Sequence, residues 1–382
     1  MVLSRAFEQW CVTYAAFHCS TSWIPDRTFV YLLRVCGGIL AIVIFTSAVD
    51  AQEQTVTRLN RLYAAARAGR IEAQIELGRD LAWGLGVQQD VSEASRWFQR
   101  GADQGNPEAQ TLLGYMYLIG RGVPQDTERA IKWFERAAAE NYAPAQTDLG
   151  AILVTGLGVR RDVDEGARWI LRAAQQGNAG AQANLGIAYI RGIGVSRDYN
   201  QAFRWLRKAA KQHEPLAEFQ IGTLYEDGRS GVRSLPEALH WYRKAAERGY
   251  APAENKLGAM YAKGNGVEQD LNQAAHWFES AAEQNNQAAI MNLFELYSGA
   301  AASDYRKAYF WAVIAQRTAA ASVQGQAPIA DDLRNHLSEE DIRSIEARAA
   351  DWIRKRSFSP DELRSSHGID VGEVATRIKV FK

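Results

Sequence analysis

The chain has 382 residues, of which 47% are hydrophobic and 23% are charged, a composition that excludes a disordered protein. Lysine plus arginine equals aspartate plus glutamate at 44 each, and this balance excludes a global field of the kind that steers nucleic acid. The three cysteines all lie before residue 51, so the rest of the chain can form neither a disulfide nor a thiolate metal site.

Residues 1–51 are predicted to be an export leader. Residues 35–49 form a run of 15 residues without a charge, which is short for a membrane-spanning helix and typical of a signal peptide. Arg34 precedes this run, and cleavage is expected after Ala51. The long stretch ahead of the run raises the hypothesis that the true start lies near Val30. The predicted location is periplasmic or secreted, and the alternative is an anchor in the inner membrane over residues 29–49.

The sequence that follows repeats with a period of 36 residues. Leu-Gly or Ile-Gly pairs end at Gly78, Gly114, Gly150, Gly186, Gly222 and Gly258. Tryptophan recurs at the same interval, at Trp97, Trp133, Trp169, Trp205, Trp241 and Trp277, and Trp311 continues the series after a slightly shorter loop. Self-similarity at a fixed period indicates a repeat architecture.

Each unit is predicted to hold two helices joined by a glycine-containing turn. In the first helix, Ala109, Leu113 and Tyr117 share one face at helical spacing. The glycine inside this helix implies that two helix backbones approach each other there. Gly-x-Gly-Val follows, with a first glycine that permits a left-handed helix end, at Gly84, Gly120, Gly156, Gly192 and Gly264. Aspartate or serine then begins the second helix as its N-cap, at Asp90, Asp126, Asp162, Asp198, Ser234 and Asp270.

The second helix carries an apolar face, formed in the first unit by Ala94, Trp97 and Phe98. It is expected to end at residues that tolerate a left-handed backbone, namely Gly105, Asn141, Gly177, Gly249 and Asn285. Proline lies in the first turn of the next helix at Pro107, Pro144, Pro215 and Pro252. Such a helix pair buries its apolar face only by stacking on its neighbours, which predicts a solenoid with a continuous core.

The array is expected to be capped at both ends. Residues 56–68 form a lone helix that aligns with the second helix of a unit. In the last unit Phe294 replaces the glycine, while Asp304 remains as an N-cap. The predicted domains are therefore the leader over 1–51, the solenoid over 52–312, polar capping helices over 313–356 and a loose tail over 357–382.

The units share the pattern A-x-x-x-L-G-x-x-Y-x-x-G-x-G-V-x-x-D-x-x-x-A-x-x-W-x-x-x-A-A-x-x-G. This pattern resembles the Sel-1-like repeat family, a relative of the tetratricopeptide repeat. The resemblance implies an all-α fold, a right-handed α-solenoid superhelix of about seven helix-turn-helix repeats. It also implies an adaptor role, with exported bacterial members common.

No catalytic residue, cofactor or metal site is predicted. Gly-x-Gly follows no expected strand, so we interpret it as a turn and not as a dinucleotide motif. The sequence holds no Walker A, His-Glu-x-x-His, Gly-x-Ser-x-Gly or Ser-x-x-Lys pattern. A cysteine-rich exported branch of the family is described as binding penicillin, and the cysteine-free body departs from it. We expect a protein that is not an enzyme; the alternative is an envelope hydrolase of penicillin-binding or β-lactamase type.

One candidate surface is a basic double column on the second helices. Its first column holds Arg96, Lys132, Arg168, Arg204, His240 and His276, and its second holds Arg100, Arg136, Arg172, Lys208 and Lys244. Residues four apart share a helix face, so the two columns would suit an anionic partner such as an acidic loop or a polysaccharide. The plainer interpretation is that the cations complement helix dipoles and are neutralised by nearby acids.

The favoured surface is the face of the first helices opposite the core, where identities change between units. Tyr115, Ile187 and Phe219 are expected to be exposed anchors, and Arg79 and Thr223 belong to the same surface. The alternative is partial burial against neighbouring units.

The predicted function is a protein–protein interaction scaffold or regulatory adaptor of the bacterial cell envelope that binds its partner on the concave surface. The expected partner is a protein, such as an envelope sensor or a polysaccharide-assembly protein, and not nucleic acid. Contact with a membrane is expected only through the leader. The alternative is a structural spacer in a polysaccharide-assembly complex.

Overall fold

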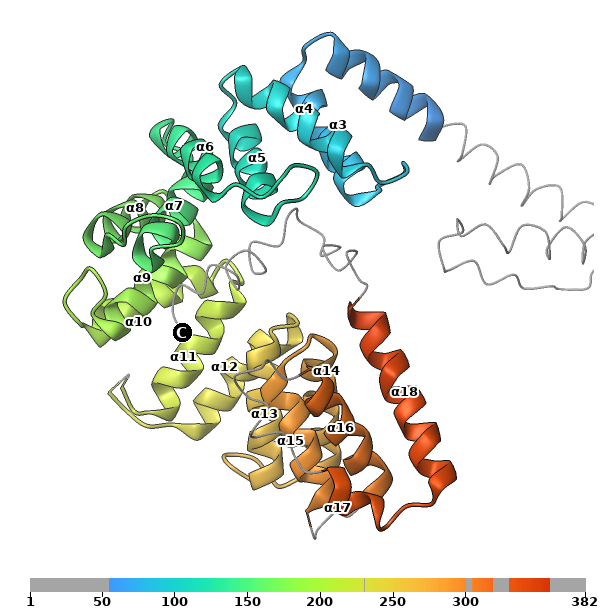
Figure 1. Ribbon diagram of the computed structural model, residues 1–382. Coiled ribbons are helices and arrows are strands. Elements are labelled where there is room, and N and C mark those ends of the chain that lie inside the picture. Colours follow the sequence, from blue (N-terminus) through green and yellow to red (C-terminus); the bar gives the residue numbers. More distant parts are fainter. Residues whose placement is uncertain (1–54, 230, 300–303, 319–329, 358–382) are drawn as a thin grey trace, which may run out of the picture. The chain divides into compact units, whose positions relative to one another are not determined.

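The computed structural model describes residues 55–229, 231–299, 304–318 and 330–357 (Figure 1). These residues form helices and no strand, and none of their helices has the length and apolar character needed to cross a bilayer. The chain divides into Met1–Thr57 and Arg58–Lys382, and every helix pair belongs to the second unit. The predicted leader and its cleavage site lie outside the described residues, as does the predicted tail apart from Ser357, which ends a helix.

The described helices form consecutive pairs in which each helix packs on the one before it and the one after it, as Figure 1 shows. The first helices are α3 (Ile71–Trp83), α5 (Pro107–Ile119), α7 (Ala143–Thr155), α9 (Ala179–Arg191), α11 (Pro215–Glu226), α13 (Ala251–Lys263) and α15 (Gln287–Ser298). The second helices are α4 (Val91–Asp103), α6 (Thr127–Ala139), α8 (Val163–Gln175), α10 (Tyr199–Ala210), α12 (Leu235–Glu247), α14 (Leu271–Glu283) and α16 (Tyr305–Thr318). The predicted all-α solenoid is confirmed.

A further helix lies at each end of the array. The helix over residues 55–67 precedes α3, and its Leu62 and Ala66 belong to the same buried cluster as Phe98 of α4. At the other end α17 (Ala330–Arg334) and α18 (Glu339–Ser357) pack on α16. In this packing Trp352 meets Trp311 edge to face, with ring centroids 5.7 Å apart. Both additional segments therefore cover core surface that a terminal repeat would otherwise expose.

The predicted helix boundaries follow from capping residues and are confirmed. The first glycine of each Gly-x-Gly has a φ near +70° and ends its helix, as at Gly120. Asp126 accepts a hydrogen bond from the backbone N–H of Arg129, and the other predicted N-caps make the equivalent bond. In the fourth repeat His213 takes the left-handed position with a φ of 65°, where the sequence predicted no such residue.

The recurring glycine of the first helix makes room for a side chain and not, as expected, for a helix backbone. A Cβ on Gly78 would lie 2.5 Å from the ring of Phe98, and one on Gly222 would lie 2.7 Å from the ring of Tyr242. Backbone atoms also come close in the third repeat, where a Cβ on Gly150 would lie 2.8 Å from the carbonyl oxygen of Gly166, and in the fourth, where one on Gly186 would lie 3.3 Å from that of Ala202. The glycine therefore makes a socket for a core side chain from the second helix of its own repeat.

The second glycine of Gly-x-Gly packs on the preceding repeat. A Cβ on Gly194 would lie 2.6 Å from the backbone oxygen of Val163 at the start of α8. Gly122 approaches Val91 of α4 in the same way. This contact fixes how closely one repeat stacks on the next.

Buried amide side chains join successive repeats in a ladder. Gln146 Nε2 donates to the carbonyl oxygen of Ala138 at 3.1 Å, and Gln146 Oε1 accepts from Gln176 Nε2 at 2.6 Å. The same arrangement recurs in the first and fourth repeats, where Gln104 donates to Gln74 and Gln212 donates to Gln182.

The ladder is broken in the second repeat, because Glu140 occupies the position of the donating glutamine. Gln110 Oε1 is buried, and no donor reaches it within the part of the chain that the structure describes. A buried acceptor without a donor costs about 1–3 kcal/mol.

Glu140→Gln is therefore expected to raise the free energy of unfolding by about 1 kcal/mol, because its amide can donate to Gln110. Urea titration followed by circular dichroism measures this change. The matched control is Gln176→Glu, which removes the donor to Gln146 and is expected to lower stability by a similar amount. If both substitutions shift the urea midpoint in the same direction, the ladder does not couple the repeats.

Candidate functional site

Two of the residues predicted to be exposed anchors are buried. Tyr115 is 3% exposed and Ile187 is 2% exposed, so the expectation of exposed anchors is wrong at both positions. Tyr115 reaches across to the next repeat, where its hydroxyl donates to Asp148 Oδ2 at 2.5 Å. Its ring also meets Phe134 edge to face at 5.2 Å. The alternative given by the sequence was burial against neighbouring units. It holds for Tyr115 and Ile187.

The partner of Tyr115 is a buried acid that the sequence analysis missed. Asp148 of α7 is 4% exposed, and burial raises the pKa of its carboxyl to about 7, against an opposing hydrogen bond from Tyr115. Burial and the adjacent carboxylate raise the pKa of Tyr115 well above its usual value. The equivalent positions of the other repeats hold Glu76, Leu112, Asn184, Gln220 and Lys256, so an acid at this mostly polar position carried no signal of burial.

Arg79 lies between two repeats. Its guanidinium forms an ion pair with Glu108 at the start of α5, and its side chain is 40% exposed. An ion pair with this exposure contributes little to stability. Arg79 is therefore paired with another residue of the chain. It lies in the first repeat, whereas Phe219 and Thr223 lie in the fifth.

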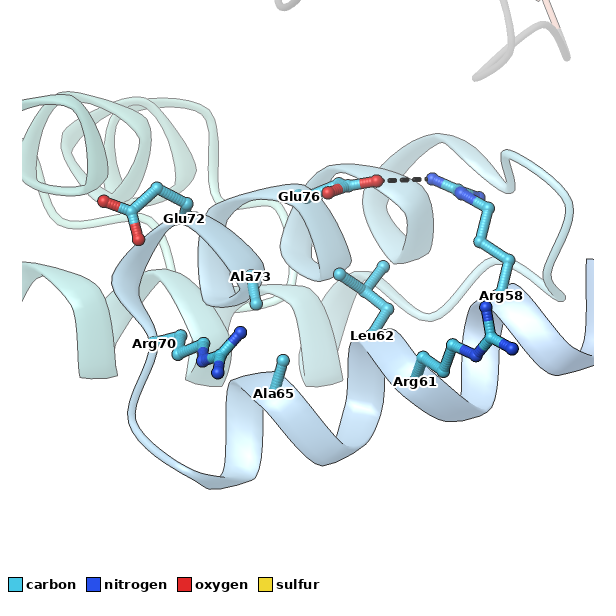
Figure 2. Close-up of a pocket in the computed structure, with 8 residues that line it drawn as sticks. All are labelled: Arg58, Arg61, Leu62, Ala65, Arg70, Glu72, Ala73 and Glu76. Carbon is cyan, nitrogen blue, oxygen red and sulfur yellow. Dashed lines mark hydrogen bonds and ion pairs between the residues drawn. The ribbon is translucent and has the colours of Figure 1, made fainter.

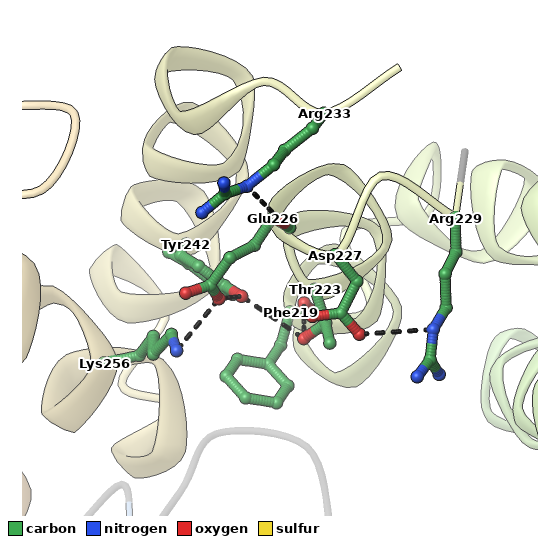
Figure 3. Close-up of polar contacts among 8 residues, drawn as sticks. All are labelled: Phe219, Thr223, Glu226, Asp227, Arg229, Arg233, Tyr242 and Lys256. Carbon is green, nitrogen blue, oxygen red and sulfur yellow. Dashed lines mark hydrogen bonds and ion pairs between the residues drawn. The ribbon is translucent and has the colours of Figure 1, made fainter. Parts of the chain in front are cut away.

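Phe219 and Thr223 both line an open depression of about 360 Å³. Figure 3 draws the polar contacts around them. Both residues lie on α11 and are partly exposed. The depression is also lined by Arg191, Gln220, Glu226, Asp227, Tyr242 and Lys256. Side chains from α9, α11, α12 and α13 thus meet around two of the predicted binding residues.

A hydrogen-bond network fixes the polar side of this depression. Tyr242 Oη donates to Glu226 Oε2 at 2.7 Å, and Lys256 Nζ lies 2.9 Å from the same oxygen. Tyr242 Oη also lies 3.3 Å from Thr223 Oγ1. Figure 3 shows these side chains converging from three helices. Tyr242, Glu226 and Lys256 were not predicted; the signal was a tyrosine in the core slot that holds phenylalanine in the first repeat.

The charges of the depression suit recognition more than proton transfer. Burial acts to raise the pKa of Glu226, but hydrogen bonds from Lys256 and Tyr242 outweigh it, and the net pKa is lowered. Burial raises the pKa of Tyr242 well above its ordinary value. Near pH 7 the network therefore holds a carboxylate and a neutral phenol, and neither is poised to exchange a proton.

Phe219 also belongs to an aromatic cluster. The ring of Phe219 lies 5.4 Å from that of Tyr242 and 5.5 Å from that of Tyr250, between centroids. Asp227, which lines the depression, forms an ion pair with Arg229 at 3.4 Å. A partly exposed aromatic residue surrounded by charged groups is typical of an anchor in a protein interface.

A second depression of about 510 Å³ lies between the helix over residues 55–67 and α3 (Figure 2). Arg58 on its wall is bound to Glu76 at 2.7 Å and to Asp80 at 2.9 Å. Arg61 and Arg70 also line it. No group of three metal-ligating side chains occurs here or elsewhere within the described ranges.

The second basic column of the sequence analysis lies on the tryptophans. Each cation is seated over the ring three residues before it, at 4.4 Å for Arg100, 4.5 Å for Arg136, 4.7 Å for Arg172, 4.0 Å for Lys208 and 4.7 Å for Lys244. Such contacts are worth about 0.5–1 kcal/mol at exposed sites. In the first column Lys132 is paired with Glu128 at 2.7 Å. Contacts within the protein therefore account for the second basic column and for part of the first.

Comparison with known proteins identifies the repeat. A family model described as Sel1 repeat matches residues 71–106, 107–142, 143–178, 179–213, 215–250 and 251–286. A protective antigen of uropathogenic Escherichia coli strains, described as displaying an SLR fold, is 31% identical, with a TM-score of 0.54 over 84% of this chain and 67% of that chain. A Sel1 repeat protein from Oxalobacter formigenes is 33% identical, with a TM-score of 0.53 over 72% of this chain and 80% of that chain. A search of curated proteins found no match.

Proposed function

Because the chain belongs to the Sel1 repeat family, whose members are generally protein–protein interaction scaffolds, we propose that it binds a partner protein in the depression around Phe219. The observation that supports this site is a partly exposed aromatic ring beside a fixed network of charged groups. Interfaces gain most of their affinity from such aromatic anchors, while the charged rim sets orientation.

The depression is built almost wholly on helices, so a partner would meet a preformed surface. Glu226 is held by Tyr242 and Lys256, and Thr223 Oγ1 donates to the carbonyl oxygen of Phe219 at 3.2 Å. Few side chains have to be ordered when the partner binds, which lowers the entropic cost of association. An apolar side chain of the partner packs on Phe219, and a polar group beside it meets the Glu226–Lys256 pair.

We further propose that this scaffold acts in the bacterial cell envelope. The support is the uncharged run over residues 35–49, which has the length of a signal-peptide core. Capture from separate envelope and cytoplasmic fractions tests the location. Recovery of the specific partner from the cytoplasmic fraction alone would contradict it.

Phe219→Ala is expected to weaken capture of the partner by about thirtyfold, which corresponds to a hot-spot loss of about 2 kcal/mol. The measurement is affinity capture with the tagged full chain, quantified by mass spectrometry. The matched control is Phe203→Ala, because Phe203 is also partly exposed and pairs edge to face with Tyr225 at 5.7 Å, outside the depression.

The control is expected to capture the partner as well as the unsubstituted chain does. Circular dichroism shows whether the two variants are equally folded. Equal loss of capture in both variants would place the binding surface elsewhere. The absence of any specific partner for the unsubstituted chain would favour a structural spacer.

A further inference from the structure

The fourth repeat is strongly basic, although the chain as a whole is neutral. Asp198 is its one carboxylate, and that side chain is occupied as the N-cap of α10, where it accepts from Asn200 and Gln201. The cations of residues 179–213 are Arg191, Arg197, Arg204, Arg207, Lys208 and Lys211. Positive charge is thus concentrated in one repeat.

Three of these cations form a stripe along α10 and its C-cap residue, Lys211. Arg204, Lys208 and Lys211 follow the spacing i, i+4, i+7 and are all exposed. Seven residues of helix span about 10 Å, so the stripe is two turns long. Lys208 Nζ is held 4.0 Å from the centre of the Trp205 ring. This aromatic contact positions one charge of the stripe on the helix.

In the isolated protein the cations of the stripe repel one another, which destabilises α10. Like charges three or four residues apart destabilise a helix by about 0.2–0.5 kcal/mol per pair, and Arg204 is four residues before Lys208. The helix dipole favours cations in the last turn, which does not account for Arg204 in the middle of α10. Within the ranges that the structure describes, neither Arg204, Lys208 nor Lys211 pairs with a carboxylate. An anion from outside the chain would relieve this repulsion.

We propose that the stripe on α10 binds an acidic segment of a protein partner, with carboxylates spaced along one face of a helix. The absence of net positive charge in either neighbouring repeat carries the choice of a short protein segment over an extended polyanion. Arg168 and Arg172 of α8 and Lys244 of α12 continue the basic columns, but residues 143–178 and 215–250 each hold as many carboxylates as lysines and arginines. A long polyanion would extend over these neutral repeats, while a two-turn acidic segment need not.

This inference rests on the proposed scaffold function and adds a second contact to it. The probe is a fluorescein-labelled, alanine-rich helical peptide with glutamate at i, i+4 and i+7, and its counterpart has glutamine at those positions. Fluorescence anisotropy with the full chain is expected to show binding of the glutamate peptide that weakens as salt is added. The triple variant Arg204→Gln, Lys208→Gln, Lys211→Gln is expected to lose about tenfold in affinity, or about 1.4 kcal/mol.

The matched control is the triple variant Arg129→Gln, Lys132→Gln, Arg136→Gln on α6. It removes the same charge from another second helix, where Arg129 and Lys132 are already paired with acids. It is expected to bind the glutamate peptide within about twofold of the unsubstituted chain, because two of its three cations are already paired with acids. Equal binding of the two peptides, or equal losses in the two triple variants, would overturn the inference.

Dextran sulfate and a single-stranded oligonucleotide serve as competitors. Tighter binding of either polymer than of the glutamate peptide would also overturn the inference, because the partner would then be a polyanion. If the α10 triple variant no longer binds the glutamate peptide but still captures the native partner, the contact at the stripe is refuted. The proposed scaffold function would then remain intact. Absence of any captured partner would instead remove the proposed function.

Discussion

Gly122→Ala is expected to lower the free energy of unfolding by about 4 kcal/mol. Gly122 has a φ of 73°, a region that costs a residue with a Cβ about 1–3 kcal/mol. The new Cβ would also overlap the backbone carbonyl group of Val91 in the preceding repeat, and overpacking costs a further 1–3 kcal/mol or so. Because the obstacle is backbone, relief requires that two repeats move apart. Urea denaturation followed by circular dichroism measures the loss.

Gly105→Ala separates these two costs. Gly105 has a φ of 83°, but no atom lies within 4 Å of the position where its Cβ would be. Its substitution is therefore expected to cost only the backbone strain, about 1–2 kcal/mol. If both variants lose the same stability, the close approach between repeats at Gly122 is not a constraint on the fold.

Asp148→Asn is expected to stabilise the protein at pH 8 by up to about 4 kcal/mol and to have little effect near pH 4. Burial raises the pKa of Asp148 from 3.8 to about 7, and a tenfold change in an acid dissociation constant corresponds to about 1.4 kcal/mol. Asparagine has nearly the same shape, and its oxygen can still accept from the Tyr115 hydroxyl. The substitution therefore removes the cost of ionising a buried carboxyl.

The direction of the pH effect follows from proton binding in the two states. Below about pH 4 the carboxyl is protonated whether the chain is folded or not. Between about pH 4 and pH 7 the folded state keeps a proton that the unfolded state has lost, so stability falls as the pH rises. Above about pH 7 the loss is complete. Asp148→Asn is expected to flatten this decline.

Urea midpoints measured at pH 4.5 and pH 8 test this expectation. Asp103→Asn, a change of the same charge at an exposed position of α4, is expected to leave the pH profile unaltered. A decline for Asp148→Asn as steep as that of the unsubstituted chain would show that another group carries the pH dependence.

The helices and their ends were predictable because their signals are local. Asp126 caps α6 through a bond to a residue three positions away, and Gly120 ends α5 through its own backbone conformation. Neither interaction depends on another repeat. The period of 36 residues then extended each local prediction along the array, including the helix ends at Asn141 and Asn285.

The burial of the first helices was not predictable in the same way, because it depends on how neighbouring repeats stack. Tyr115 is buried by Phe134 in its own repeat and by Asp148 in the next one. A single helix gives no sign of that lateral contact, so an apolar residue away from the predicted core face looked exposed. Phe219 is partly exposed, so it remains a candidate for the binding anchor.

The candidate site was predicted only in part. Phe219 and Thr223 came from variation between repeats, but the residues that hold the site together come from other helices. Glu226 is near the end of α11 and Lys256 lies on α13, thirty positions later, so their ion pair follows from the stacking of two repeats. Tyr242 was hidden by its role as a core residue, since its ring fills the socket at Gly222 while its hydroxyl reaches the depression.

Hydrogen–deuterium exchange of the full chain, alone and with the captured partner, tests the binding site most directly. The account predicts that the partner protects backbone amides on α11 and α13, next to Phe219 and Lys256. It also predicts no comparable protection on α4 or α6. Protection that spares α11, or that appears only on the second helices of the first two repeats, would contradict the assignment of the depression as the binding surface.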